Sequence, residues 1–173
     1  MKIVLIGYMG SGKSSVGKQL ATKLGYQFID LDVRIELEES KTIPELFSEN
    51  GEIYFRKKEN EVLRDIVNLE HNFILATGGG TPCYGDIMHF LSSEEKTLTV
   101  YLKTSLDILT SRLMLEKNER PLISHIEDKV SLKDFIRKHL FERYYYYNQA
   151  KMQINTDELC VDEIVTAIVA QLF

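Results

Sequence analysis

Several features are scarce in this chain, and each shortage removes a class of protein. The only cysteines among the 173 residues are Cys83 and Cys160, which fit neither a disulfide framework nor paired metal-ligand spacing. The four histidines never fall at HxxxH spacing. Together these shortages argue against a zinc-binding or disulfide-rich protein.

Long apolar runs are missing as well. The stretch from Ile3 to Ile6 is too short for the core of a signal peptide or for a membrane span. The formal net charge of −5 argues against broad binding to nucleic acids or membrane surfaces, because these partners are usually met by a basic face. We therefore expect a cytoplasmic protein without nucleic-acid or membrane partners. We also expect a monomer, because no large apolar face is left unassigned.

Proline-rich and biased segments are scarce too. The chain holds three prolines and ten glycines, and it has no repeat and no stretch that resembles a linker. Its hydrophobic content of 44% is enough to bury one substantial core. We expect a single domain over residues 1–173.

Apolar stretches that predict strands alternate with periodic stretches that predict helices. The expected strands are residues 2–6, 27–29, 73–76, 98–102 and 152–154, and the expected helices are residues 14–24, 53–68, 106–115, 132–147 and 161–172. Parallel strands need long crossover connections, so this alternation predicts a five-stranded parallel sheet in a three-layer α/β/α fold. The polar segment 117–129 breaks the pattern and is predicted to be a mobile loop, either an active-site cover or an ordinary surface excursion.

The strongest motif is GYMGSGKS, residues 7–14, which matches GxxxxGK[ST] between an expected strand and an expected helix. Such a loop turns backbone N–H groups and a helix N-terminus toward phosphate oxygens. We expect Lys13 to reach the β- and γ-phosphates of a nucleotide and Ser14 to bind Mg²⁺. The residues expected to bind ATP here are Gly10, Ser11, Gly12, Lys13, Ser14 and Ser15.

Two other nucleotide-binding classes fit less well. A dinucleotide-binding GxGxxG motif would need a glycine where Ser15 stands. A GTPase switch would need DxxG and NKxD elements, and neither occurs in the sequence. The P-loop therefore favours a kinase.

Two carboxylates, Asp30 and Asp32, follow an expected strand in the segment FIDLD. In extended backbone both would project to the same face, at the strand end where α/β proteins bind ligands. One could hold Mg²⁺ and the other could take the proton of an acceptor hydroxyl. The alternative is that one of them only caps the next helix.

Three further features suggest an acceptor site. Arg56 and Glu59 lie on one helical face, where Glu59 could orient the guanidinium, although a surface ion pair is the ordinary meaning. The triple glycine at 78–80 suggests close approach of a ligand to bare backbone, or else only a flexible turn. Arg120, in the expected cover, could neutralise phosphate charge or face solvent. The rings of residues 144–147 suggest packing.

These motifs occur in the order seen in shikimate kinases: GxxxxGKS, FIDLD, GExYFR, TGGG, RPL and a late arginine followed by tyrosine. The chain resembles that family over nearly its whole length. It departs at Cys83-Tyr84, in a somewhat extended cover and in the tyrosine run 144–147.

The resemblance implies phosphoryl transfer from ATP to the 3-hydroxyl of shikimate, on the pathway to chorismate and the aromatic amino acids, in a fold similar to nucleoside monophosphate kinases. It implies a substrate-binding helical region at about 31–65, a lid at about 113–130 and Mg²⁺ as cofactor. The implied shikimate-binding residues are Asp32, Arg56, Gly78, Gly79, Gly80 and Arg143. The implied Mg²⁺ residues are Ser14 and Asp30, the implied catalytic residues are Lys13, Asp32 and Arg120, and the implied adenine-side residues are Arg112, Asn155 and Thr156.

Two other functions remain open from the sequence. A different small-metabolite kinase, such as a gluconate kinase, would share the P-loop and the cover. A non-catalytic nucleotide-binding regulator would bind ATP without acceptor-dependent release of ADP.

Overall fold

The first apolar run of the chain forms the central strand of a parallel sheet. A computed structural model describes residues 1–172, in which β1 (Lys2–Ile6) lies between β3 (Phe73–Ala76) and β4 (Thr97–Lys103). The edge strands are β2 (Gln27–Asp30) and β5 (Met152–Asn155), and the order is β2-β3-β1-β4-β5 with parallel pairing throughout. The five-stranded parallel sheet predicted from the sequence is confirmed.

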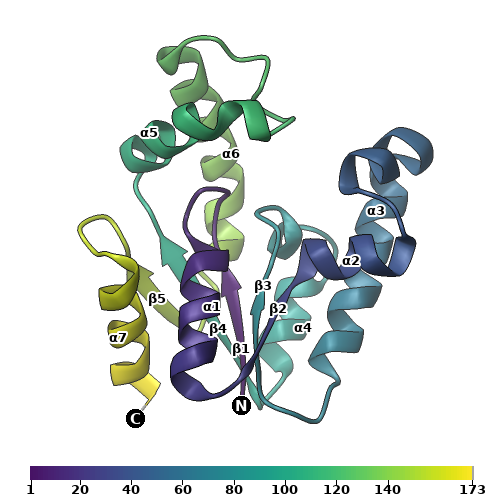
Figure 1. Ribbon diagram of the computed structural model, residues 1–173, viewed down its shortest axis with the longest axis vertical. Coiled ribbons are helices and arrows are strands. Elements are labelled where there is room, and N and C mark those ends of the chain that lie inside the picture. The colour runs from purple at the N-terminus through teal and green to yellow at the C-terminus, as the bar shows by residue number, and fades with distance from the viewer. Residues whose placement is uncertain (173) are drawn as a thin grey trace.

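Successive residues of β1 face two separate hydrophobic clusters, as the alternation of a strand requires. Ile3 and Leu5 pack in the cluster that contains α1 (Lys13–Leu24) and α7 (Val161–Leu172). Val4 and Ile6 pack in the larger cluster on the other face. The helices of that cluster are α2 (Leu31–Glu39), α3 (Ile43–Val67), α4 (Ile87–Ser93), α5 (Leu106–Glu116) and α6 (Lys129–Tyr147). Figure 1 shows the resulting three layers.

The sequence did not predict α2, α4 or the first turns of α3, and the predicted helix that began at residue 53 was too short. The α3 helix starts at Ile43 with a capping box, in which Thr42 and Glu45 satisfy each other's backbone N–H groups. It is kinked at Gly51, whose φ of 80° is not helical. A short helix, or one broken by a glycine, carries too little apolar periodicity to be seen in the sequence.

The predicted cover connects α5 to α6. After α5 ends at Glu116, a 3-10 turn, η2 (Lys117–Glu119), leads into irregular backbone. Two apolar side chains of this connection, Ile123 and Ile126, are buried in the larger cluster. The connection lies above the carboxyl ends of the strands in Figure 1. Its mobility stays a prediction.

None of the helices in the described part of the chain combines the length and apolar character that crossing a membrane requires. The last residue of the expected domain, at position 173, lies outside the described residues.

Candidate active site

The loop between β1 and α1 has the backbone geometry of a phosphate-binding loop. Gly7, Gly10 and Gly12 have φ values of 146°, 80° and 93°, which a side chain would strain. The ammonium of Lys13 donates hydrogen bonds to two carbonyl oxygens of this loop, those of Gly7 at 2.8 Å and of Tyr8 at 2.9 Å. The loop therefore curls around its own lysine.

The charge of Lys13 lies in a poorly solvated place. Only 8% of the residue is exposed. Burial lowers its pKa to about 8, although the nearby carboxylates of Asp32 and Asp30 oppose the shift. A cation that is costly to bury will bind an incoming anion strongly.

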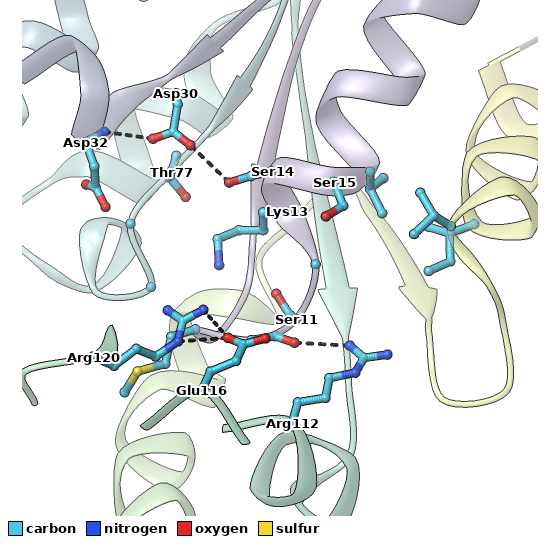
Figure 2. Close-up of a pocket in the computed structure, with 18 of the residues that line it drawn as sticks. Ser11, Lys13, Ser14, Ser15, Asp30, Asp32, Thr77, Arg112, Glu116 and Arg120 are labelled. Atoms are coloured by element: carbon cyan, nitrogen blue, oxygen red, sulfur yellow. Dashed lines mark hydrogen bonds and ion pairs between the residues drawn. The ribbon is translucent and has the colours of Figure 1, made fainter. Parts of the chain in front are cut away.

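A cavity of about 560 Å³ opens beside the loop, at the carboxyl end of the sheet. Its lining comes from six parts of the chain: residues 9–16, Asp30 with Asp32, residues 77–79, Arg112 with Glu116, Arg120, and residues 159–161 with Ile164. Figure 2 shows Lys13, Asp32 and Arg120 converging on one space from three different elements. The C-terminal edge of the sheet thus gathers the residues on which the chemistry was predicted to depend.

The two carboxylates of FIDLD both line this cavity, but not by extended backbone. β2 ends at Asp30, and Asp32 is already in the first turn of α2. Asp30 caps that helix by accepting the N–H of Asp32 at 3.1 Å, and its other oxygen accepts the hydroxyl of Ser14 at 3.0 Å. The prediction of a shared face in an extended strand was wrong. Helix capping by Asp30 holds instead, and it occurs together with the contact to the P-loop.

The carboxyl of Asp32 has an unusually high proton affinity. Burial, followed by the negative charges of Asp30 and Glu59, raises its pKa to about 6, whereas Lys13 opposes the shift. A carboxylate whose pKa lies close to neutral can both accept and return a proton. Among the residues that line the cavity, Asp32 is therefore best suited to act as a general base.

Ser14 and Asp30 form an oxygen-donor pair that suits Mg²⁺. A hydroxyl and a carboxylate lie 3.0 Å apart at the wall of the cavity. In the described part of the chain, no group of three or more His, Cys, Asp or Glu side chains could hold a metal ion by itself. Magnesium commonly takes only one or two protein oxygens and completes its shell with phosphates and water, so these residues fit it.

The triple glycine after β3 lets three charged side chains approach the backbone. A Cβ on Gly78 would lie 3.3 Å from an oxygen of Asp32, and one on Gly80 would lie 3.0 Å from Arg56. A Cβ on Gly79 would lie 3.6 Å from Arg143. Side chains of the protein itself thus come close to these glycines, and the approach of a ligand to their backbone stays a prediction.

Arg56 is held by a buried acid. Its Nη1 donates to Glu59 at 2.8 Å, and Glu59 is 1% exposed and also accepts the hydroxyl of Thr81 at 2.6 Å. The pairing of Arg56 with Glu59 was predicted from their spacing, and it is not an ordinary surface ion pair.

Arg56, Gly80 and Arg143 are not among the residues that line the cavity. They lie behind its glycine wall: Gly79, which lines the cavity, is close to Arg143, and Gly80 follows it directly. The guanidinium of Arg143 also lies 5.3 Å from the ring centre of Tyr8.

Arg120 lines the cavity and lies just after η2, the 3-10 turn that follows α5. Its Nε and Nη2 donate to one oxygen of Glu116, at 3.0 and 2.6 Å. Arg112, one turn before Glu116, donates to the carbonyl of Gly10 in the P-loop at 3.0 Å. Figure 2 shows Glu116 between the two arginines.

The residues predicted beside adenine are only partly brought together. Arg112 lines the cavity, whereas Asn155 and Thr156 do not. Thr156 is fully buried, where its hydroxyl bonds Thr104 at 2.6 Å. Instead, the cavity is lined by Leu159 and Cys160 from the loop after β5 and by Val161, the first residue of α7.

Sequence reasoning missed several lining residues, and three of them left a signal. Glu116 lies four positions before Arg120, the spacing of an ion pair across one helical turn. Leu159 and Cys160 follow the last strand, where an α/β sheet binds its ligands.

The fold and the site define a class of protein: a P-loop nucleotide-binding protein with the nucleoside monophosphate kinase-like architecture. The model of the family described as "Shikimate kinase" matches residues 9–173. The shikimate kinase of Flavobacterium psychrophilum is 44% identical over 172 residues, which cover 99% of each chain. This chain therefore belongs to the shikimate kinase family.

Solved structures agree over the whole length. The shikimate kinase of Bacteroides thetaiotaomicron superposes with a TM-score of 0.90 at 37% identity, covering 99% of this chain and 98% of that one. The Acinetobacter baumannii shikimate kinase, solved in complex with shikimate, superposes with a TM-score of 0.86 at 32% identity, covering 99% of this chain and 92% of that one.

Proposed function

We propose that this chain transfers the γ-phosphoryl group of ATP to the 3-hydroxyl of shikimate, giving shikimate 3-phosphate. The observation that carries the proposal is the placement of the P-loop Lys13 and the high-pKa carboxyl of Asp32 on one cavity. A phosphate-binding cation and a base beside it are the two parts that a kinase for an alcohol needs. Membership of the shikimate kinase family supports the choice of acceptor.

Positioning and charge neutralisation supply most of the catalysis. The transferred group passes through a loose transition state, so its oxygens carry charge that Lys13 and Arg120 offset. Asp32 orients the acceptor hydroxyl toward the phosphorus and takes its proton late in the step. Because the carboxyl is half-buried and partly desolvated, less solvent competes for the hydroxyl.

Magnesium would be held by Ser14 and Asp30. Ser14 follows Lys13 at the end of the P-loop, and its hydroxyl contacts the carboxylate of Asp30. When bound, the ion supplies neutralisation of the phosphate oxygens.

The acceptor's carboxylate is held by Arg56 and Arg143. The two guanidinium groups reach Gly80 and Gly79, on either side of one peptide unit of the glycine turn. Asp32 reaches the preceding residue, Gly78. An acceptor lying along this turn would present its carboxylate to the arginines and a ring hydroxyl to Asp32, which suits a rigid ring acid better than an acceptor without a carboxylate.

One coupled assay of ADP release tests the function. With ATP and Mg²⁺ present, we expect turnover with shikimate and little turnover with gluconate or nucleoside monophosphates. The Lys13→Met variant, which keeps the length of the side chain without its charge, should be inactive. Turnover with gluconate and not with shikimate would show that gluconate is the acceptor. ATP binding without ADP release for any acceptor would indicate a regulator.

We also propose that the chain works in the cytoplasm as a monomer, with ATP and shikimate as its partners. Light scattering of the purified protein in the presence and absence of both substrates measures the oligomeric state. A mass near twice the chain's 20.0 kDa would overturn the monomer.

A further inference from the structure

We propose that Tyr84 is a positioning residue for the acceptor, because its ring and its hydroxyl hold the Arg56 guanidinium in the orientation that binds a carboxylate. The inference rests on the proposed function, since it assumes that Arg56 pairs with the acceptor. Tyr84 lies immediately after the 3-10 turn η1 (Thr81–Cys83), which itself follows the glycine turn. This turn therefore brings Tyr84 next to Arg56, which also lies close to Gly80.

The ring of Tyr84 makes the closest aromatic contact of Arg56. The guanidinium carbon lies 3.9 Å from the ring centre of Tyr84 and 5.2 Å from that of Phe55. A flat guanidinium is attracted to the negative face of an aromatic ring, and it keeps the contact only while its plane stays over that ring. The contact therefore restricts how the plane of Arg56 can turn.

The hydroxyl of Tyr84 contacts Glu52, a second acid beside Arg56. It donates to Oε1 of Glu52 at 2.9 Å, and the same oxygen lies 3.6 Å from Nε of Arg56. At 3.6 Å the ion pair is too long for a hydrogen bond, and Nε is buried without a hydrogen-bond partner among the described residues. Tyr84 thus holds the carboxylate of Glu52 in the position from which it attracts the Arg56 guanidinium.

The other sides of the guanidinium are set by the fold. Glu59 holds Nη1 at 2.8 Å, and Gly80 comes so close to Nη2 that a Cβ there would lie 3.0 Å away. Nη2 has no hydrogen-bond partner in the described part of the chain. Tyr84 covers the face, Glu59 holds one edge, and Nη2 is left for the acceptor. A hydrogen bond from Nη2 to the acceptor's carboxylate depends on this orientation of the plane.

The alternative is that Tyr84 only fills the surface beside η1. It is 38% exposed, so this alternative is a real one. The two roles differ in their dependence on Arg56. A filler contributes to stability whatever stands at position 56, whereas a positioning residue acts on the acceptor only through the guanidinium.

Two substitutions separate the ring from the hydroxyl. We expect Tyr84→Leu to raise both the Kd and the KM for shikimate about 10-fold, because the guanidinium loses its face contact and Glu52 loses its donor. Tyr84→Phe keeps the ring, and we expect a rise of about 3-fold. The Kd for ATP should stay within about 2-fold of wild type in both variants, because Tyr84 does not line the nucleotide cavity.

A matched control is available on α6. Tyr145 is 74% exposed and lies outside the site, so Tyr145→Leu removes the same atoms and should leave both dissociation constants unchanged. Thermal unfolding of all three variants shows whether any loss of affinity follows from loss of structure.

The decisive experiment is a double-mutant cycle with Arg56. In an Arg56→Lys background, we expect Tyr84→Leu to weaken shikimate binding by less than about 2-fold, since the planar group is already gone. The inference fails if Tyr84→Leu has the same effect in both backgrounds, or if it leaves shikimate binding unchanged in a protein that phosphorylates shikimate. A wild-type protein that does not phosphorylate shikimate would overturn the proposed function itself.

Discussion

At the scale of single residues, the site depends on two opposite charges that are partly shielded from water. Burial lowers the pKa of Lys13 to about 8 and raises that of Asp32 to about 6. Each shift brings the group closer to neutral pH than it would be in solvent. The same burial therefore prepares the cation for phosphate and the carboxylate for a proton.

These shifts predict a bell-shaped pH profile for kcat/KM. Asp32 must be deprotonated, so activity should fall as the pH drops through about 6 rather than about 4. Lys13 must be protonated, so activity should fall as the pH rises through about 8. Initial rates at subsaturating shikimate and constant ionic strength measure both limbs.

Asp32→Asn tests which group makes the acidic limb. The amide cannot take the hydroxyl proton, so we expect kcat to fall by about 10²- to 10⁴-fold and the acidic limb to disappear. Turnover close to that of wild type would remove Asp32 from the chemistry.

Arg56→Lys tests recognition of the acceptor. A single ammonium cannot form two parallel hydrogen bonds to a carboxylate, so we expect shikimate binding to weaken by about 1.5–3 kcal/mol. Isothermal titration with shikimate measures the change, and an unaltered affinity would exclude Arg56 from the acceptor site. Binding of ATP serves as the internal control.

At the scale of elements, the turn after β3 and the connection after α5 bring the site together. The turn is bare backbone because the P-loop and three charged side chains all lie against it. The connection carries Arg120 to the cavity, anchored by the buried Ile123. Neither segment is regular structure, yet both are placed by buried contacts.

Gly79→Ala should disturb both substrates at once. A Cβ at this position would lie 3.0 Å from the backbone nitrogen of Met9, which belongs to the P-loop and cannot rotate away. We expect the KM values for ATP and for shikimate each to rise about 10-fold or more, as a small displacement in a positioned site can cause. Steady-state kinetics with each substrate varied in turn measure the effect.

The matched control for this prediction is Gly25→Ala. Gly25 caps α1 with a φ of 67°, and no atom outside its immediate neighbours lies within 4 Å of a Cβ there. The substitution should cost about 1 kcal/mol of stability through backbone strain and leave both KM values unchanged. Equal kinetic effects of the two substitutions would contradict the close-approach explanation.

Arg120→Ala should lower kcat without lowering stability. The guanidinium pairs with Glu116 at a site where both side chains are partly exposed, so it contributes little to the fold. Its loss removes charge neutralisation in the transition state, and we expect kcat to fall by about 10²-fold or more. Arg137→Ala, which removes an exposed arginine paired with Asp134, is the control and should change neither quantity. A large drop in Tm for Arg120→Ala alone would instead mark Arg120 as structural.

At the scale of the whole molecule, we expect the desolvated charge of Asp32 to lower the stability of the fold. The folded-state pKa of Asp32 is about 6, above its ordinary value near 4, so the folded protein binds the proton more tightly than the unfolded chain. Stability therefore falls as the pH rises from about 4 to about 6, and the full cost persists above that range.

Asp32→Asn should consequently stabilise the protein free of substrates. At pH 8 we expect a gain of roughly 1–3 kcal/mol in the free energy of unfolding, and at pH 5 about half of that gain. Urea unfolding of wild type and variant at the two pH values measures the difference. A variant that is less stable than wild type at pH 8 would contradict the unfavourable burial of the Asp32 charge.

Much of this architecture could be predicted from local pattern. The strands, the P-loop and the glycine cap of α1 are encoded by residues that lie next to one another in the chain. The short α2 and α4 helices could not be predicted, because contacts with the rest of the fold stabilise them and their own sequences show little apolar periodicity. The shared face of Asp30 and Asp32 in an extended strand was wrongly predicted, since the chain turns into a helix between them, although both line the cavity.

The sequence by itself determined the kind of chemistry: a phosphate-binding loop, two carboxylates, several arginines and a turn of bare glycine, each written as a short motif. Only the tertiary structure decided their use. It placed Glu59 out of water beneath Arg56, set Glu116 against Arg120, and buried Thr156 instead of presenting it to the nucleotide cavity. The physical reason is that desolvation and close approach depend on atoms contributed by distant segments, and no local pattern of residues specifies them.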